Sequence, residues 1–231
     1  MSEGTFGNPE IVEVETDLLI IGGGMAACGA AFEAKRWAGD DVKITLVDKA
    51  ALDRSGAVAQ GLSAINTYIG ENQPEDYVRM VHADLMGITR DDLVFDVGRH
   101  VDDSVELFEE WGLPIWKTKE TEGVPLKDGG KPVRSGRWQI MINGEGYKTI
   151  VAEAAKKAIG IENIYERVFI VKLLLDANEE NRIAGAVGLS VREHKLYVFK
   201  CNSALLVAGG AVNVFRPRST GEGQGRTWYP V

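Results

Sequence analysis

The feature that most constrains this chain is a run of glycines between two apolar segments. Residues 16–24 read TDLLIIGGG, which is typical of a short buried strand that ends in a glycine turn. The Ala-rich residues 25–39 follow and end at a glycine, as a helix does. Residues 41–49, DVKITLVDK, indicate a second buried strand that ends at Asp48. This order of strand, glycine turn, helix, strand and acid predicts a nucleotide-binding α/β unit.

The glycine spacing refines that prediction to a dinucleotide. The pattern G-x-G-x-x-G/A is fitted by Gly22, Gly24 and Ala27. We expect the amides around Met25 and Ala26 to point at the phosphates, helped by the helix dipole. We expect the Asp48 carboxylate to accept hydrogen bonds from an adenosine ribose. A tight strand–helix turn in an unrelated α/β fold is the alternative.

The rest of the chain predicts how this unit is extended. Residues 74–111 are helical in pattern, residues 117–137 indicate a surface excursion, and residues 146–160 indicate another helix. Residues 164–210 then predict a β-meander and a last apolar strand, with 195–210 divided into two strands. The predicted fold class is α/β, with a parallel sheet, a β-meander and an inserted helical segment. Residues 1–15 are expected to be a polar N-terminal arm, and residues 16–231 one domain.

Composition excludes several classes of function. The formal net charge of −8 argues against a nucleic-acid surface and against docking to anionic lipid. Cys28 and Cys201 lie far apart without a CxxC pair, so they build neither a disulfide scaffold nor an iron–sulfur site. The scattered histidines offer no metal-ligand spacing, so we expect no metal. Residues 1–10 resemble no signal peptide, and we expect a cytoplasmic location.

A long loop of small and polar residues, LDRSGAVAQGLSAIN, follows Asp48 at residues 52–66. This loop, together with DLLIIGGGMAACGAA, LVDKA, GEGYK and ALLVAGGA, resembles the fumarate reductase and succinate dehydrogenase flavoprotein superfamily, which includes aspartate oxidase and adenylylsulfate reductase. The resemblance covers nearly all of residues 16–231 and implies a Rossmann-like FAD-binding domain. It implies that the loop lies along the flavin, where small residues permit close approach of the main chain. A solvated surface loop is the alternative.

The same resemblance extends the set of cofactor-binding residues. It implies FAD contacts from Lys49, Ser55, Gly56, Gln60, Gly61, Ser63, Val168, Ala208, Gly209 and Gly210. Respiratory members of the superfamily carry a histidine, covalently bonded to FAD, where this chain has Gly56. A glycine cannot form that bond, so we expect FAD to be held non-covalently.

Within the superfamily the chain is most similar to the alpha subunits of dissimilatory adenylylsulfate reductases, on GGGMAACGAAFEAKRW, AQGLSAINTYIG and VFRPRSTGEGQGRTWYPV. This resemblance implies reversible reduction of adenylylsulfate by two electrons to sulfite and AMP. It also implies a beta subunit that carries two [4Fe–4S] clusters and delivers the electrons. A soluble fumarate reductase, an aspartate oxidase and a non-catalytic FAD-binding module remain as alternatives.

Three residues are candidates for the chemistry. Arg226 carries a fork-shaped cation that suits phosphate and sulfate oxygens, and Trp228 a flat face for adenine or flavin. The resemblance places Asn66 beside the flavin. The alternatives are a solvated basic loop for Arg226, core packing for Trp228 and a turn-capping role for Asn66. Further catalytic residues are expected in a capping domain and later segments, so this stretch alone is expected to be inactive.

Overall fold

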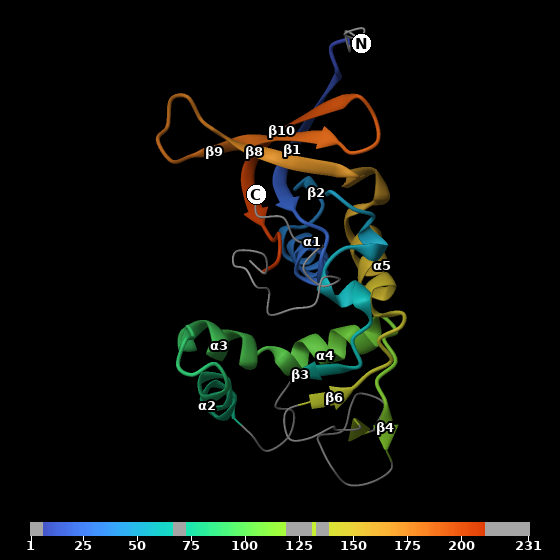
Figure 1. Cartoon of the computed structure of the whole chain (residues 1–231), viewed down its shortest axis with the longest axis vertical. Coiled ribbons are helices and arrows are strands. Elements are labelled where there is room, and N and C mark those ends of the chain that lie inside the picture. Colours follow the sequence, from blue (N-terminus) through green and yellow to red (C-terminus); the bar gives the residue numbers. More distant parts are fainter. Residues whose placement is uncertain (1–6, 67–72, 119–130, 133–138, 211–231) are drawn as a thin grey trace, which may run out of the picture. The chain divides into compact units, whose positions relative to one another are not determined.

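The computed structural model describes residues 7–66, 73–118, 131–132 and 139–210 (Figure 1). The chain divides into two compact units. Unit 1 comprises residues 1–59 and 151–231, and unit 2 comprises residues 60–150. The predicted inserted helical segment lies in unit 2, and the extent of one domain over residues 16–231 stays a prediction.

Unit 1 is built on a mixed six-stranded sheet in the order β7-β2-β1-β10-β9-β8. Its principal elements are β1 (Glu10–Ile21), α1 (Met25–Ala38), β2 (Ile44–Asp48), β7 (Ile164–Glu166), β8 (Val168–Leu175), β9 (Ile183–Ser190) and β10 (Lys195–Leu206). Strands β7, β2, β1 and β10 are parallel, whereas β9 and β8 continue the sheet antiparallel. The prediction of an α/β fold with a parallel sheet and a β-meander is confirmed.

Two boundaries differ from the sequence prediction. Strand β1 begins at Glu10, so residues 10–15, which are expected in a polar arm, form its first half and pair with β10. Their alternation of charged and apolar residues explains this, because Val14 is buried while its glutamate neighbours are exposed. Strand β10 is continuous where two strands are expected. It pairs with β1 along its whole length and with β9 over residues 196–200, so one strand belongs to both halves of the sheet.

The core of unit 1 lies on both faces of the parallel strands. One cluster comprises Val14, Leu19, Ile21, Val47, Val168, Ile170, Ala186, Phe199 and Cys201. Because side chains alternate along a strand, Ile20 and Leu46 face the opposite side, and both are fully buried. Helix α1 packs against β1 and β2 and buries Ala27, Cys28 and Ala31. The position of Cys28 agrees with the packing role expected for a small buried residue.

Unit 2 is largely helical. It holds β3 (Ala64–Asn66), α2 (Pro74–Asp84), α3 (Asp91–Gly98), α4 (Val101–Glu110), β4 (Lys117–Thr118), β5 (Lys131–Pro132) and β6 (Gln139–Met141), and it shares α5 (Tyr147–Ile159) with unit 1. Strand β3 pairs with β6, and β4 pairs with β5. Residues 74–111, which are helical in pattern, form the three helices α2, α3 and α4, and Met86 and Gly87 adopt positive φ after α2. Among the described residues, no helix is both long and apolar enough to cross a membrane.

Candidate cofactor site

The glycine turn after β1 lies between the ends of two neighbouring strands. The Gly22 amide donates to the Val47 carbonyl at the end of β2, at 2.9 Å. The Val207 amide, just after β10, donates to the Ile21 carbonyl, also at 2.9 Å. Gly22 has φ +124°, and an added Cβ would lie 2.5 Å from the Val207 carbonyl oxygen. A side chain at this position would therefore force the ends of β1 and β10 apart.

The turn leads directly into the N-terminus of α1. Gly24 is the N-cap in extended conformation, and no side-chain hydrogen bond of the described residues caps this end. Met25 and Ala26 are exposed, and the first turn contains no acidic residue. Helix N-termini carry partial positive charge, so this end suits an anion. That Met25 and Ala26 receive a pyrophosphate stays a prediction.

Asp48 lies beside the same turn. Its side chain is largely buried, and its Oδ2 accepts a hydrogen bond from the Ala50 amide at 3.1 Å. An added Cβ on Gly23 would lie 2.7 Å from the Asp48 Cγ. The middle glycine of the three therefore has a function of its own, because it lets the carboxylate reach the turn. The G-x-G-x-x-G/A pattern allows any residue at this position. The unbroken run of three glycines was the sequence feature that could have indicated the contact with Asp48.

The segment after Asp48 returns to the turn. Lys49 is half-buried, which lowers the pKa of its ammonium, while the Asp48 carboxylate opposes that shift. After the short 3₁₀ turn η1 (Leu52–Arg54), Ser55 is buried and Gly56 adopts φ +82°. An added Cβ on Gly56 would lie 2.7 Å from the Gly24 Cα. The two ends of residues 48–56 thus contact two adjacent glycines of one turn.

A third loop reaches this end of the sheet after β10. Ala208 is half-buried, whereas Gly209 and Gly210 are exposed, and Gly209 has φ +86°. The parallel pairing of β2, β1 and β10 brings the carboxyl ends of these strands to one edge of the sheet. This is the edge at which open α/β sheets bind their ligands. Among the described residues of unit 1, the predicted site residues lie at this edge with one exception.

The exception is Val168, the first residue of β8. Its side chain is buried within the core cluster of unit 1. It pairs with Ser190 of β9 in the meander. Any contact of Val168 with a cofactor would therefore come from its main chain.

The remaining predicted residues fall in unit 2 or outside the described residues. Four lie on the segment that leads into and forms β3, and all four are exposed: Gln60, Gly61, Ser63 and Asn66. Asn66 ends β3 and pairs with Gln139 of β6. The Ser63 carbonyl accepts from the Ile142 amide at 2.9 Å. Arg226 and Trp228 lie outside the described residues, so their roles and their relation to Asn66 stay predictions.

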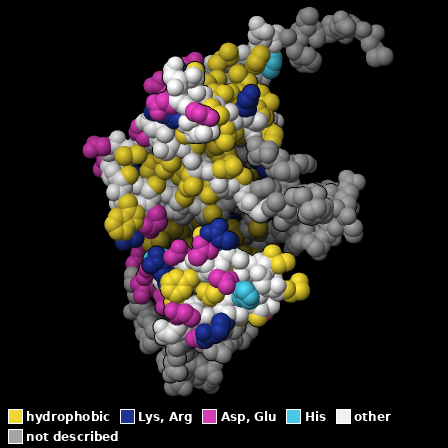
Figure 2. All heavy atoms as spheres, turned by 90° about the vertical axis from the view of Figure 1, so that its left-hand side faces the viewer, with side chains coloured by type: hydrophobic (Ala, Val, Ile, Leu, Met, Phe, Trp, Pro, Cys, Tyr) yellow, Lys and Arg dark blue, Asp and Glu magenta, His cyan; other side chains and the backbone are white. Residues whose placement is uncertain are grey.

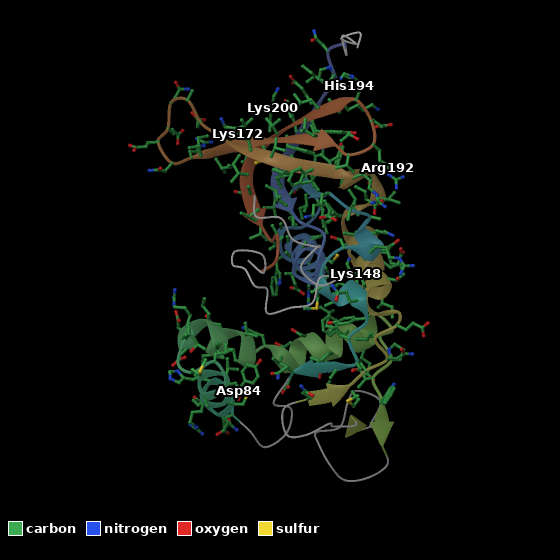
Figure 3. All side chains as sticks on the ribbon, in the orientation of Figure 1. Asp84, Lys148, Lys172, Arg192, His194 and Lys200 are labelled. Atoms are coloured by element: carbon green, nitrogen blue, oxygen red, sulfur yellow. The ribbon has the colours of Figure 1, made fainter. Side chains whose placement is uncertain are left out.

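A hollow in unit 1 lies away from this edge. It has a volume of about 470 Å³ and is lined by residues 15–17 of β1, 200–202 of β10 and residues of the β8–β9 turn, among others. Its charged groups are largely paired: Asp17 accepts from the Lys43 amide and from Asn202, and Lys200 pairs with Glu13. Figure 3 shows Lys200 on the meander together with Lys172. The glycines, helix terminus and buried acid lie elsewhere, so the candidate site is not this hollow.

Apolar side chains also remain exposed on the meander. They include Val171, Leu173, Leu175, Leu189 and Val191. Figure 2 shows hydrophobic side chains gathered on the visible face of the sheet unit. This surface contains none of the predicted site residues.

The site fits the adenosine diphosphate half of FAD. The absence of side chains at Gly22, Gly23 and Gly56 lets the end of β10, the Asp48 carboxylate and the returning loop all lie against one turn. The N-terminus of α1 offers positive potential for phosphates, and Asp48 offers a buried acceptor for ribose hydroxyls.

Comparison with known proteins agrees with this geometry. Residues 17–227 match the family described as FAD binding domain. The chain is 63% identical to the alpha subunit of the adenylylsulfate reductase of Megalodesulfovibrio gigas, over 96% of its own length and 36% of that protein. It is 28% identical to one of the subunits of the fumarate reductase (CoM/CoB) of Methanothermobacter marburgensis, over 87% of this chain and 36% of that protein.

Solved structures of adenylylsulfate reductases are also similar to this chain. The adenylylsulfate reductase of Archaeoglobus fulgidus matches with a TM-score of 0.82 and 61% identity, over 96% of this chain and 34% of that chain. A structure of adenosine-5-phosphosulfate reductase with sulfite as a covalent adduct matches with a TM-score of 0.82 and 61% identity, over 96% of this chain and 35% of that chain. This chain therefore spans about a third of the length of these relatives. By its sequence and its fold, the chain belongs to the FAD binding domain family.

Proposed function

We propose that this chain is the FAD-binding part of the alpha subunit of an adenylylsulfate reductase. The observation that carries the proposal is the high identity to adenylylsulfate reductases over nearly the whole chain. The identity to the fumarate reductase is less than half as high. The proposal therefore favours adenylylsulfate over fumarate or aspartate as the substrate.

The proposed reaction is the reversible two-electron reduction of adenylylsulfate to sulfite and AMP. The bond between sulfur and the bridging oxygen breaks, AMP leaves with that oxygen and the electron pair of the bond, and the two electrons from the reduced cofactor become the lone pair on the sulfur of sulfite. When bound, FAD supplies the two-electron chemistry. Electrons are proposed to arrive from a beta subunit with two [4Fe–4S] clusters, in the cytoplasm.

In this proposal the described site residues of unit 1 bind the cofactor and do not touch the substrate. The N-terminus of α1 and the glycine turn would hold the pyrophosphate, and Asp48 the adenosine ribose. Ser55, Lys49 and the loop at residues 208–210 would complete this part of the site. Their proposed effect is to fix the cofactor in place before any substrate binds.

The residues proposed to act on the substrate lie on other parts of the chain. Asn66 would donate its side-chain amide to an oxygen of the sulfur group. Arg226 would stabilise charge on sulfate or phosphate, and Trp228 would form a flat wall against adenine. Gln60, Gly61 and Ser63 would follow the flavin on the way to Asn66.

Non-covalent attachment of FAD is supported by the surroundings of Gly56. Its positive φ and its contact with Gly24 leave no space for a linking side chain without a shift of the main chain. Acid precipitation of the full-length holoprotein should therefore release all flavin into the supernatant. Yellow colour that persists in a washed pellet would contradict this.

Two titrations of the full-length holoenzyme test the proposed activity. Sulfite should change the flavin absorbance of the oxidised enzyme, and AMP should enable oxidation of sulfite by an added electron acceptor. Fumarate added to the reduced enzyme is the matched comparison and should leave the flavin reduced. Reoxidation by fumarate without any response to sulfite would favour the fumarate reductase alternative. A bound flavin that responds to neither would favour the non-catalytic module.

A further inference from the structure

The short turn η1 is held by residues that lie more than 100 positions away in the sequence. The Leu52 amide, at its start, donates to the Glu166 Oε1 of β7 at 2.6 Å. The Lys156 Nζ of α5 donates to the Asp53 Oδ1 at 2.8 Å. The Leu52 side chain is fully buried. These contacts therefore fix η1 at its first two residues, Leu52 and Asp53.

The residue next to Glu166 reinforces the same attachment. Arg167 joins β7 to β8 and has φ +62°, which is uncommon for a residue with a side chain. Its amide donates to the Ala50 carbonyl at 3.3 Å, and its carbonyl accepts from the Val191 amide at 2.8 Å. The end of β7 therefore holds the segment at both Ala50 and Leu52, through main-chain groups and one carboxylate.

This segment is the one that returns to the glycine turn. Asp48, at its start, lies against Gly23, and Gly56, at its end, lies against Gly24. Between these contacts, η1 sets the path of the main chain, since the Ser55 amide donates to the Leu52 carbonyl at 3.4 Å. The position of Ser55 and Gly56, at the carboxyl ends of the parallel strands, thus depends on where η1 is held.

We propose that Glu166 is a positioning residue for FAD. Its carboxylate fixes the main chain of η1 and thereby holds Ser55 and Gly56 against the glycine turn in the conformation that accepts the cofactor. Lys156 acts in the same way from the other side, through Asp53. The proposal rests on FAD binding at the glycine turn and is independent of the substrate.

The test is the affinity of full-length apoprotein for FAD, measured by quenching of flavin fluorescence. Glu166→Ala should raise the FAD Kd roughly tenfold, as expected for loss of a hydrogen bond to a charged acceptor. Glu166→Gln keeps an oxygen acceptor at the same place and should restore the Kd to within about threefold of wild type. Glu180→Ala, in the exposed β8–β9 turn, is the matched control and should leave the Kd unchanged.

The unfolding temperature of the apoproteins separates positioning from general stability. We expect the Tm of Glu166→Ala to remain close to that of Glu166→Gln while their FAD affinities differ. Equal FAD affinity in wild type and Glu166→Ala would overturn the proposal, and so would equal losses in the Ala and Gln variants. If Glu166→Ala does not fold, Lys156→Met carries the test, and unchanged FAD affinity in that variant overturns the proposal. Because flavin binding alone is measured, failure of the proposed adenylylsulfate activity would leave this result unaffected.

Discussion

Gly56 and Gly61 belong to one stretch of the sequence and both have positive φ, +82° and +83°. Their surroundings differ. A Cβ at Gly56 would lie 2.7 Å from the Gly24 Cα, whereas no described atom lies within 4 Å of a Cβ at Gly61. Among the described residues, the first glycine makes a tertiary contact that requires it, whereas the second is required by its positive φ. The loop therefore has two parts: one shaped against the glycine turn, and one that presents exposed polar residues.

This contrast predicts different consequences for the two parts. Variants in residues 48–56 should change the affinity for FAD and the stability of unit 1. Variants in residues 60–66, which would lie along the flavin, should lower FAD affinity less and should mainly change the rate of the reaction.

The largest effect is expected for Gly56→Ala. The left-handed conformation costs about 1–2 kcal/mol for alanine, and the contact with Gly24 adds about 1–3 kcal/mol of overpacking. The free energy of unfolding should therefore fall by about 2–5 kcal/mol. Denaturant unfolding and FAD titration of the full-length protein measure both consequences. A variant as stable as wild type that binds FAD equally well would show that the Gly24–Gly56 contact is dispensable.

Asn66→Ala should have a large effect on rate and little effect on cofactor content. If Asn66 acts as a single oxyanion donor, the chemical step slows by about 10²–10³-fold. Stopped-flow reduction of adenylylsulfate by the reduced holoenzyme gives this rate. Asn178→Ala, in the exposed β8–β9 turn, is the control and should react at the wild-type rate. Loss of FAD from Asn66→Ala would place Asn66 among the cofactor-binding residues. It would contradict the different roles expected for residues 48–56 and 60–66.

Asp48→Ala should weaken FAD binding by about 1.5–3 kcal/mol, the range for hydrogen bonds to a charged acceptor. Asp48→Asn keeps one acceptor oxygen and should lose less affinity. Gly23→Ala should reproduce part of the loss, because its methyl group would displace the Asp48 carboxylate. The FAD Kd of the three variants provides the check. A wild-type Kd in Asp48→Ala contradicts the assignment of the ribose to Asp48.

Gly61→Ala should have the smallest effect. Here the left-handed conformation alone acts, at about 1–2 kcal/mol in the free energy of unfolding. FAD affinity should fall less than in Gly56→Ala, because a methyl group at Gly61 would meet no described atom. Denaturant unfolding in parallel with Gly56→Ala makes the pair directly comparable, and a loss equal to that of Gly56→Ala would remove the contrast between the two glycines.

The sequence predicted those features that depend on local pattern. The strand–glycine–helix–strand unit, the acid at Asp48 and the antiparallel meander follow from periodicity and residue type, and the structure contains them. The continuity of β10 could not be predicted, because it depends on pairing with β1 and β9 at once. The sequence also did not predict that Gly23 contacts Asp48, that Gly56 contacts Gly24, or that Glu166 accepts from the Leu52 amide. The two residues of each pair are distant in the sequence, and the fold brings them together.

The central claim is that the glycine turn, the N-terminus of α1 and Asp48 form a site for the adenosine diphosphate half of FAD. The most direct test compares the affinity of wild-type full-length apoprotein for FAD and for FMN, which lacks the adenosine monophosphate group. FAD should bind at least roughly tenfold more tightly, because FMN forgoes the hydrogen bonds to Asp48, and ADP should compete with FAD. Equal affinity for FAD and FMN, with no competition by ADP, would contradict the assignment of this edge of the sheet to the cofactor.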